Sequence, residues 1–187
     1  VSIAAGKMLS TEGNLTLATG KLIFTDDKSR IIAATSGTGL AKITLPDTYD
    51  NKGIIFSGGD LELNARVVTN TGTGALAAGG NLSVNAPDGL TNNGALYAGN
   101  DMTLKTGVFV NSGGGSSIDV GRDLNVEATY GFTNNNAIDA GRNITISSQS
   151  FLNAPTGGDT RVFSQQHLEI FPGVFIEVFT GSNGPGQ

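Results

Sequence analysis

The 187-residue sequence contains no cysteine, no tryptophan and a single histidine, His167. Without cysteine the chain can form neither a disulfide nor a cysteine nucleophile, so its stability has to come from non-covalent packing. A metal site built from His and Cys is excluded for the same reason. A serine–histidine–acid triad would depend on His167, which we expect to be a surface or packing residue. The sequence therefore predicts no catalytic residue, no metal and no cofactor.

Charge is also scarce, since only 14% of the residues are charged and the net charge is −5. The 11 Lys and Arg residues are scattered along the chain, whereas phosphate binding needs clustered positive charge, so nucleic acid is not an expected partner. No run of 18 apolar residues occurs, and no membrane insertion is predicted. The first residues, VSIAAGKMLS, do not form a signal peptide, and we expect Val1 to begin a segment of a longer protein.

Glycine, in contrast, is abundant, with 28 residues, and part of it recurs at a fixed interval. At five regularly spaced places a glycine is followed two positions later by Asp or Asn, with spacings between these glycines of 21, 20, 22 and 20 residues. Apolar residues recur three positions before each glycine and three and five positions after it. A period near 20 residues is typical of a solenoid, whose coils bury their apolar faces only by stacking on one another. The pairs are Gly58/Asp60, Gly79/Asn81, Gly99/Asp101, Gly121/Asp123 and Gly141/Asn143.

Strand periodicity indicates which solenoid this is. Segments such as Leu61-Glu62-Leu63 alternate apolar and polar residues with period two. A second short apolar segment precedes each glycine, and a third segment ends in Asn. Three short strands and three turns per coil predict an all-β, right-handed parallel β-helix of about 20–22 residues per coil. About eight coils at roughly 4.8 Å each would form a rod on the order of 40 Å long. The apolar residues three and five positions after each glycine should point inward.

Two repeated positions are assigned structural roles. The glycines are expected at corners, where a positive φ is tolerated without a Cβ clash. The Asn residues that end the third segment are expected to form a ladder of side-chain hydrogen bonds, because an amide both donates and accepts. The corner glycines are Gly58, Gly79, Gly99, Gly121 and Gly141. The ladder residues are Asn70, Asn92, Asn111, Asn134 and Asn153.

The segments LTNNGALYAGNDMTLKTG, FTNNNAIDAGRNITISS and AGGNLSVNA resemble the haemagglutinin-type repeats of filamentous haemagglutinin and of the large exoproteins of contact-dependent growth inhibition systems. The resemblance covers about Ile54 to Asn153. It implies a shaft, exported by two-partner secretion through an outer-membrane transporter, that presents adhesive or toxin-delivery elements at the surface of a Gram-negative bacterium or after secretion. A protein or glycan receptor on a host or target cell is the implied partner. The Asn-Pro-Asn motifs of the family's secretion domain are absent, which places the segment in the body of the exoprotein.

The chain departs from the regular repeat at both ends, and this suggests three parts: irregular coils with projecting loops over residues 1–55, regular haemagglutinin-like coils over 56–160, and aromatic-rich terminal strands, or a cap and tail, over 161–187. Polar runs at 26–30 and 47–52 are expected to project as loops. The interpretations left open for them are solvated turns or a partner contact through Asp47, Tyr49, Asp50 and Lys52.

The last part carries four of the nine phenylalanines. Pro172-Gly173 separates two expected strands and favours a corner between faces rather than a tight hairpin. The aromatics either close the last coil or form a binding surface through Phe171 and Phe175. We expect the regular coils to act as a spacer and the irregular elements to hold any recognition site, because Tyr, Phe and Arg dominate binding energy.

An enzyme is the competing hypothesis, because many β-helices cleave polysaccharides. Stacking would bring together Asp101 with Asp123, or Asp119 with Asp139, as carboxylate pairs. Asn or Tyr replaces these residues in other coils, which suits backbone capping better than acid–base catalysis. The sequence thus favours a structural or adhesive protein over a carbohydrate-active enzyme. A concave surface shared by Tyr97, Asp119, Asp139 and Arg122 would favour the enzyme.

Overall fold

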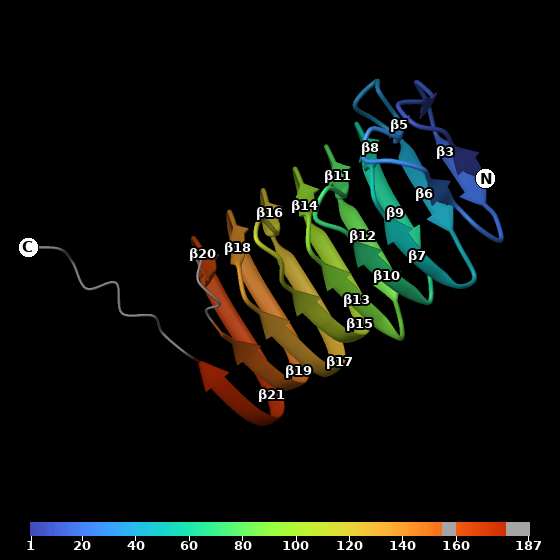
Figure 1. The fold of residues 1–187 in the computed structure, drawn as a ribbon. Helices are drawn as coiled ribbons and strands as arrows, with labels where there is room; N and C mark the ends of the chain where they lie inside the picture. The colour runs from blue at the N-terminus through green and yellow to red at the C-terminus, as the bar shows by residue number, and fades with distance from the viewer. Residues whose placement is uncertain (155–159, 179–187) are drawn as a thin grey trace, which may run out of the picture.

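The chain folds into a single stack of parallel coils (Figure 1). The computed structural model describes residues 1–154 and 160–178, with the backbone alone for 172–178. Within these residues it contains 21 β-strands and no helix, and every strand pairing is parallel. The first coil and strands β20 and β21 lie at opposite ends of the stack. The expected parallel β-helix is thereby confirmed, with about eight turns.

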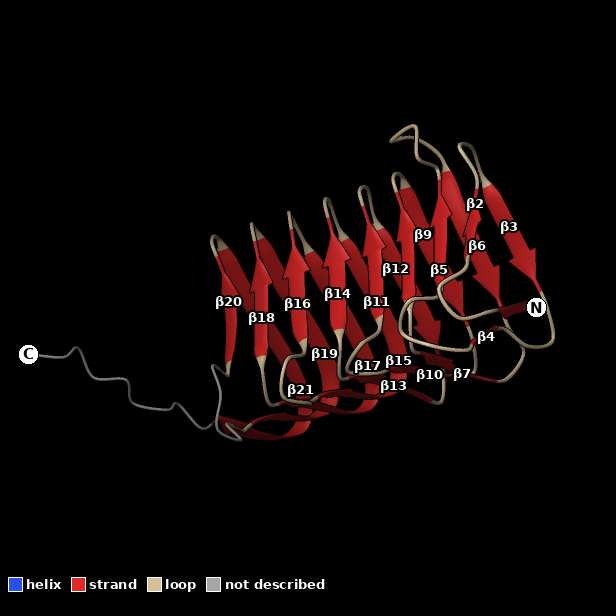
Figure 2. Cartoon of the chain, turned by 45° about the horizontal axis from the view of Figure 1, so that its top comes forward, coloured by secondary structure: helices blue, strands red, loops and turns tan. Residues whose placement is uncertain are grey.

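One sheet forms a single face of the solenoid and receives one short strand from each coil (Figure 2). In order along the stack its strands are β2 (Met8–Ser10), β5 (Arg30–Ala33), β8 (Ile54–Ser57), β11 (Ala75–Ala78), β14 (Ala95–Ala98), β16 (Ser117–Val120), β18 (Ala137–Ala140) and β20 (Arg161–Ser164). From β8 to β18 the strands are short because each begins after the turn that follows an asparagine and ends at a corner glycine.

A larger sheet of 11 strands covers the other two faces. In the earlier coils these two faces are built from separate strands: β3 (Leu15–Ala18), β6 (Leu40–Thr44), β9 (Asp60–Asn64) and β12 (Leu82–Ala86) on one, and β7 (Thr48–Asn51), β10 (Val67–Asn70) and β13 (Gly89–Asn92) on the other. In the later coils one long bent strand spans both: β15 (Met102–Asn111), β17 (Leu124–Asn134), β19 (Asn143–Asn153) and β21 (His167–Val178). Strands β1 (Ser2–Ile3) and β4 (Ile23–Phe24) pair with each other.

Each long strand bends where its register with the next one shifts. The shifts fall between Thr106 and Val108, and between Ala128 and Phe132. In the last pair of strands the shift lies between Ser148 and Ser150, opposite Pro172 and Phe175. The segment Pro172-Gly173 therefore lies at a bend between two faces inside one continuous strand, and not in a hairpin.

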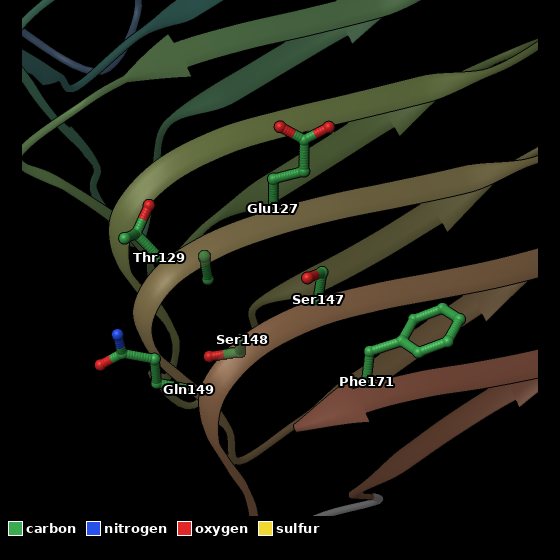
Figure 3. Close-up of a pocket in the computed structure, with 7 residues that line it drawn as sticks. Glu127, Thr129, Ser147, Ser148, Gln149 and Phe171 are labelled. Atoms are coloured by element: carbon green, nitrogen blue, oxygen red, sulfur yellow. The ribbon is translucent and has the colours of Figure 1, made fainter. Parts of the chain in front are cut away.

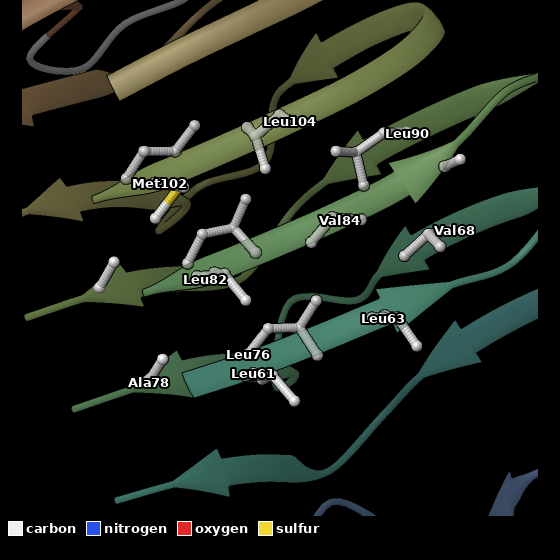
Figure 4. Packing of buried hydrophobic residues seen from close by; sticks show 14 of the residues in the cluster. Leu61, Leu63, Val68, Leu76, Ala78, Leu82, Val84, Leu90, Met102 and Leu104 are labelled. Carbon is white, nitrogen blue, oxygen red and sulfur yellow. The ribbon is translucent and has the colours of Figure 1, made fainter. Parts of the chain in front are cut away.

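The core consists of rows of apolar side chains that repeat from coil to coil (Figure 4). Leu82, Met102 and Leu124 are paired in register and are fully buried, as the alternation predicted. The third strands add a row in which Phe109, Phe132 and Phe151 stack nearly parallel, with ring centroids 4.9 and 5.1 Å apart. Each buried side chain thus packs on its equivalents in the two adjacent coils, and the core extends along the whole stack.

The corner glycines have a physical basis different from the expected one. None of them has a positive φ, since the positive-φ glycines among the described residues are Gly6, Gly37, Gly39 and Gly113. They are required because the backbone of one coil passes directly over that of the previous coil. A Cβ atom on Gly99 would lie well inside van der Waals distance of the Gly79 carbonyl oxygen, and the other four corners show the same approach.

This close approach predicts the effect of Gly99→Ala. The new methyl group would meet backbone rather than a movable side chain, so the free energy of unfolding should fall by about 1–3 kcal/mol, as for other overpacked sites. Gly114→Ala is the matched control, because no atom lies within 4 Å of its Cβ position and its φ is not positive. Urea unfolding of both variants measures the difference. Equal stability of Gly99→Ala and the unsubstituted protein would contradict the proposed close contact.

Candidate functional site

An asparagine ladder runs through the interior at the end of the third strands. The side-chain amide of each asparagine except the last donates to the Oδ1 atom of the asparagine in the next coil, at 2.8–2.9 Å. All six asparagines are buried. Four of them also donate to the backbone carbonyl of the first residue of the short strand in the next coil. The ladder thereby satisfies polar groups that would be costly to bury alone. Its members are Asn51, Asn70, Asn92, Asn111, Asn134 and Asn153.

Asn51 is a ladder member that the sequence pattern did not predict. It ends strand β7, which occupies the polar run 47–52 that was expected to project as a loop. Strand β7 pairs in register with β10, so that Tyr49 lies beside Val68 and Asn51 beside Asn70. The sequence does contain one signal for Asn51 as a ladder position, because Asn51 and Gly53 have the Asn-x-Gly spacing of Asn92 and Gly94. The irregular spacing of the preceding coils obscured this signal.

Tyr49 was predicted to contact a partner, and the structure shows that this expectation is wrong. Its side chain is only 1% exposed, because Tyr49 takes the inward position of a strand whose alternate residues Thr48 and Asp50 point to solvent. Its hydroxyl donates to Oδ1 of Asn51 at 3.1 Å, and its ring meets the edge of Phe24. Tyr49 therefore caps the asparagine ladder.

The other three predicted residues of this segment do lie at the surface. Asp47, Asp50 and Lys52 are exposed, and the latter two line a small cavity of about 170 Å³ together with Lys21 and Ile23. Residues 26–29 of the other polar run form a turn between β4 and β5, and Arg30 begins β5. In this turn the pKa of the Asp26 carboxyl lies below its usual range, chiefly because Ser29 donates a hydrogen bond to it.

The acidic and amide residues that follow the corner glycines form a second ladder, on the outside. Oδ1 of Asp60 accepts from the backbone N–H of Asn81, and the same contact recurs along the next three coils at 3.2–3.3 Å. Arg122 binds Asp101 through two nitrogens, and Arg142 pairs with Asp123. The Asp101 and Asp123 carboxylates are thus occupied by backbone capping and by ion pairs, as Asn at equivalent positions suggested.

Phe171 lies at the edge of a cavity that measures about 520 Å³ (Figure 3). The cavity follows the bend of strands β17, β19 and β21, and its lining is mostly polar, with Glu127, Ser147 and Gln149 among the residues. The Phe171 ring is 51% exposed. Phe175, the other predicted aromatic contact, is paired with Ser150 in β21, and its side chain lies outside the described residues.

A second cavity, of about 330 Å³, lies on the face formed by the short strands. It brings together Tyr97, Asp119 and Asp139, three of the four residues proposed to discriminate an enzyme from a structural protein, and adds Phe163. The fourth residue, Arg122, is not part of the lining and pairs with Asp101. Asp139 is held by Arg161 through two hydrogen bonds of 2.7 and 2.8 Å.

Residues 1–154 and 160–178 contain no group of three or more His, Cys, Asp or Glu side chains arranged to hold a metal ion. In these two ranges there is also no helix of the length and apolarity needed to cross a membrane.

The fold and its repeated contacts define a parallel β-solenoid built from one recurring sequence unit. Comparison with known families gives that unit its name, because the haemagglutinin repeat family matches residues 1–65, 56–116 and 109–154. The chain belongs to this family, and the match extends through the irregular coils at its start. The comparisons found no match among curated proteins and none among solved structures.

Removal of one ladder asparagine should destabilise the fold. Asn92→Ala deletes the acceptor of Asn70 and the donor to Asn111 inside the core, so the free energy of unfolding should fall by about 2–4 kcal/mol. Asn125→Ala is the control, because Asn125 is exposed on the outer face of β17. Thermal and urea unfolding measure the effect. A loss below that of the control would show that the ladder has no stabilising role.

The buried hydroxyl of Tyr49 predicts a dependence of stability on alkaline pH. Burial, assisted by the Asp50 charge, raises the pKa of Tyr49 above its usual value of about 10. The folded state therefore holds the phenol proton more tightly than the unfolded state. The resulting contribution to the free energy of unfolding is fully present below pH 10 and is lost as the pH rises above 10. At pH 7 Tyr49→Phe should lose about 1 kcal/mol through its missing hydrogen bond.

Above pH 10 Tyr49→Phe should become the more stable of the two proteins, because only the unsubstituted protein has a phenol at position 49 that ionises on unfolding. Urea unfolding between pH 7 and 11 tests this, with Tyr130→Phe, at an exposed position, as the control. Parallel stability curves for Tyr49→Phe and the unsubstituted protein would contradict the buried, hydrogen-bonded state of Tyr49.

Proposed function

We propose that this chain is a segment of the shaft of a bacterial surface exoprotein, and that it holds adhesive or toxin-delivery elements at a distance from the cell. Family membership supports a structural or adhesive role, since haemagglutinin repeat proteins are secreted or cell-surface adhesins of Gram-negative bacteria. Export by a two-partner system through an outer-membrane transporter, and a location outside the cell, are parts of the same proposal.

The observation that carries the proposal is that the stabilising contacts run between coils. Strand pairs, aromatic stacks and the asparagine ladder each join a residue to one about 20 positions away. Six surface ion pairs do the same, and each contributes little alone. An array held together in this way is a continuous rod whose length is set by the number of coils. The ion pairs are Lys42–Glu62, Arg66–Asp88, Arg122–Asp101, Lys105–Glu127, Arg142–Asp123 and Arg161–Asp139.

Partner recognition is assigned in this proposal to the places where the coils depart from the repeat. These are the exposed Asp47, Asp50 and Lys52 near the start, and Phe171 with Phe175 near the end. A receptor on another cell is the implied partner, either a protein or a glycan. Catalysis is not part of the proposal, because backbone capping and arginine contacts occupy the Asp101 and Asp123 carboxylates.

A whole-coil deletion tests the spacer role. Removal of residues 58–78 joins Ser57 to Gly79. Ser57 is the equivalent of Ala78 in the previous coil, so the new junction reproduces the natural Ala78–Gly79 junction. The shortened protein should fold cooperatively, with far-UV circular dichroism typical of β-structure, and its rod should be shorter by about 4.8 Å. Its adhesion to cells that bind the intact chain should be unchanged, because the expected contact residues all remain.

The control removes residues 58–67 only, which leaves half a coil that cannot pair in register with the coils on either side, and it should be less stable than the whole-coil deletion. A folded whole-coil deletion that no longer adheres would show that the regular coils themselves recognise the partner. Failure of the intact chain to adhere to any cell of a bacterial and epithelial panel would remove the adhesive part of the proposal and leave the structural part.

A further inference from the structure

The face formed by the short strands carries one outward row whose residues change from coil to coil. Along β14, β16, β18 and β20 the row consists of Tyr97, Asp119, Asp139 and Phe163, each paired in register with the next. In the preceding strand β11 the same position is Ala77. Two aromatic rings thus flank two carboxylates on neighbouring strands, and the rings are three coil steps apart, about 14 Å at the usual strand spacing.

The row borders a hollow because its neighbours are small. The cavity of about 330 Å³ is lined next to the carboxylates by Val120, Ala140, Gly121 and Gly141. The two glycines are corner residues that backbone stacking keeps free of side chains. The Tyr97 and Phe163 side chains are 47% and 52% exposed, so both rings are accessible to a ligand beside the cavity.

Charge on this surface is concentrated and only partly balanced. Asp119 and Asp139 lie directly beside each other in the register of β16 and β18, an arrangement that like charges disfavour. Arg161 binds Asp139 in a two-nitrogen contact, and this hydrogen bonding, with the charges of Asp139 and Asp119, raises the pKa of the guanidinium. The three groups together carry one net negative charge and present planar acceptors and donors to the solvent.

We propose that Tyr97, Asp119, Asp139, Arg161 and Phe163 form a binding surface for a neutral oligosaccharide. Sugar rings have apolar faces that pack on aromatic rings, and hydroxyl groups that donate to carboxylates and accept from a guanidinium. This inference rests on the proposed adhesive role and names a ligand class for it. The surface adds to the contact residues assigned above and does not involve the Phe171 cavity.

Other ligand classes fit this surface less well. A sulfated or uronate-rich polymer would meet a net negative charge. An extended peptide would need unpaired backbone groups for strand addition, and β14, β16 and β18 are paired on both sides. Addition at the outer edge of β20, the last strand of this sheet, would not involve Tyr97 or Asp119. A polycation would satisfy the carboxylates, but Arg161 already occupies Asp139 and would repel it.

Binding of the intact chain to immobilised glucan, galactan and mannan tests the proposal, with heparin and polylysine as the charged probes. At least one neutral polysaccharide should bind, with an affinity that changes little between 50 and 500 mM salt. Tyr97→Ala and Phe163→Ala should each weaken this binding about tenfold, as expected for exposed aromatic contacts, and Asp119→Ala by a smaller factor. Melting temperatures should stay unchanged, because both rings are exposed. Tyr130→Ala is the matched control, since it removes an exposed aromatic that has no assigned binding role, and Phe171→Ala tests the other cavity.

Three results would overturn the proposal. The first is no binding of any neutral polysaccharide. The second is binding that Tyr97→Ala and Phe163→Ala leave intact while Phe171→Ala removes it, which would place the site in the other cavity. The third is binding of polylysine alone, lost with Asp119→Ala and at high salt, which would make the surface a cation site. None of these results affects the spacer role, which the deletion of residues 58–78 tests at coils that do not contribute to this surface.

Discussion

In-register stacking of parallel strands is the constraint on which the rest of this structure depends. Each coil pairs its backbone with the coils on both sides, so a residue and its equivalent about 20 positions later occupy the same environment. An apolar residue in the inward row must have apolar residues above and below it. A polar residue in that row must find its partner in the same row, and asparagine does so because one amide can donate to the next. The corner glycines follow from the same constraint, because stacked backbones leave no room for a Cβ atom.

The same constraint distributes stability along the rod. Each coil depends on its neighbours for the burial of its apolar side chains, as in other repeat architectures. Leu9 and Leu168, which lie in outermost coils of the described stack, are 37% and 42% exposed, whereas their equivalents in the middle are fully buried. Polar inward groups are handled by the asparagine ladder, which Tyr49 begins at one end. Cooperative contacts between coils thus replace the disulfides that the sequence lacks.

Freedom to vary remains at the outward positions, and there the coils differ in ways that suit recognition. The outward position of the short strands holds Ala77 in one coil and Tyr97, Asp119, Asp139 and Phe163 in the next four. A shaft of this kind separates its two tasks, because inward residues maintain the rod while outward residues change without disturbing it. The proposed saccharide surface uses this separation, since removal of its aromatic rings takes nothing from the core.

The sequence alone determined the repeat, the strand pattern, the inward apolar rows and the position of the asparagine ladder from Asn70 onward. These features are periodic, and stacking makes sequence period and spatial neighbourhood the same. The tertiary structure decided the features that do not follow from the sequence repeat. It made Tyr49 a buried residue, because the run around it pairs as a strand despite its polar composition. It also showed that corner glycines are needed for contact between coils and not for a positive φ.

Side-chain partnerships on the outer surface were likewise settled only in three dimensions. The sequence places Arg122 and Arg142 one position after corner glycines, but their pairing with Asp101 and Asp123 depends on which side chains reach across one coil step. The presence of Phe163 and Tyr97 beside the same cavity depends on strand β20 continuing the short-strand sheet after an interval that breaks the regular spacing. Periodicity fixes where the backbone of a regular coil lies, whereas contacts at variable and irregular positions depend on side-chain reach and local register, which the period does not specify.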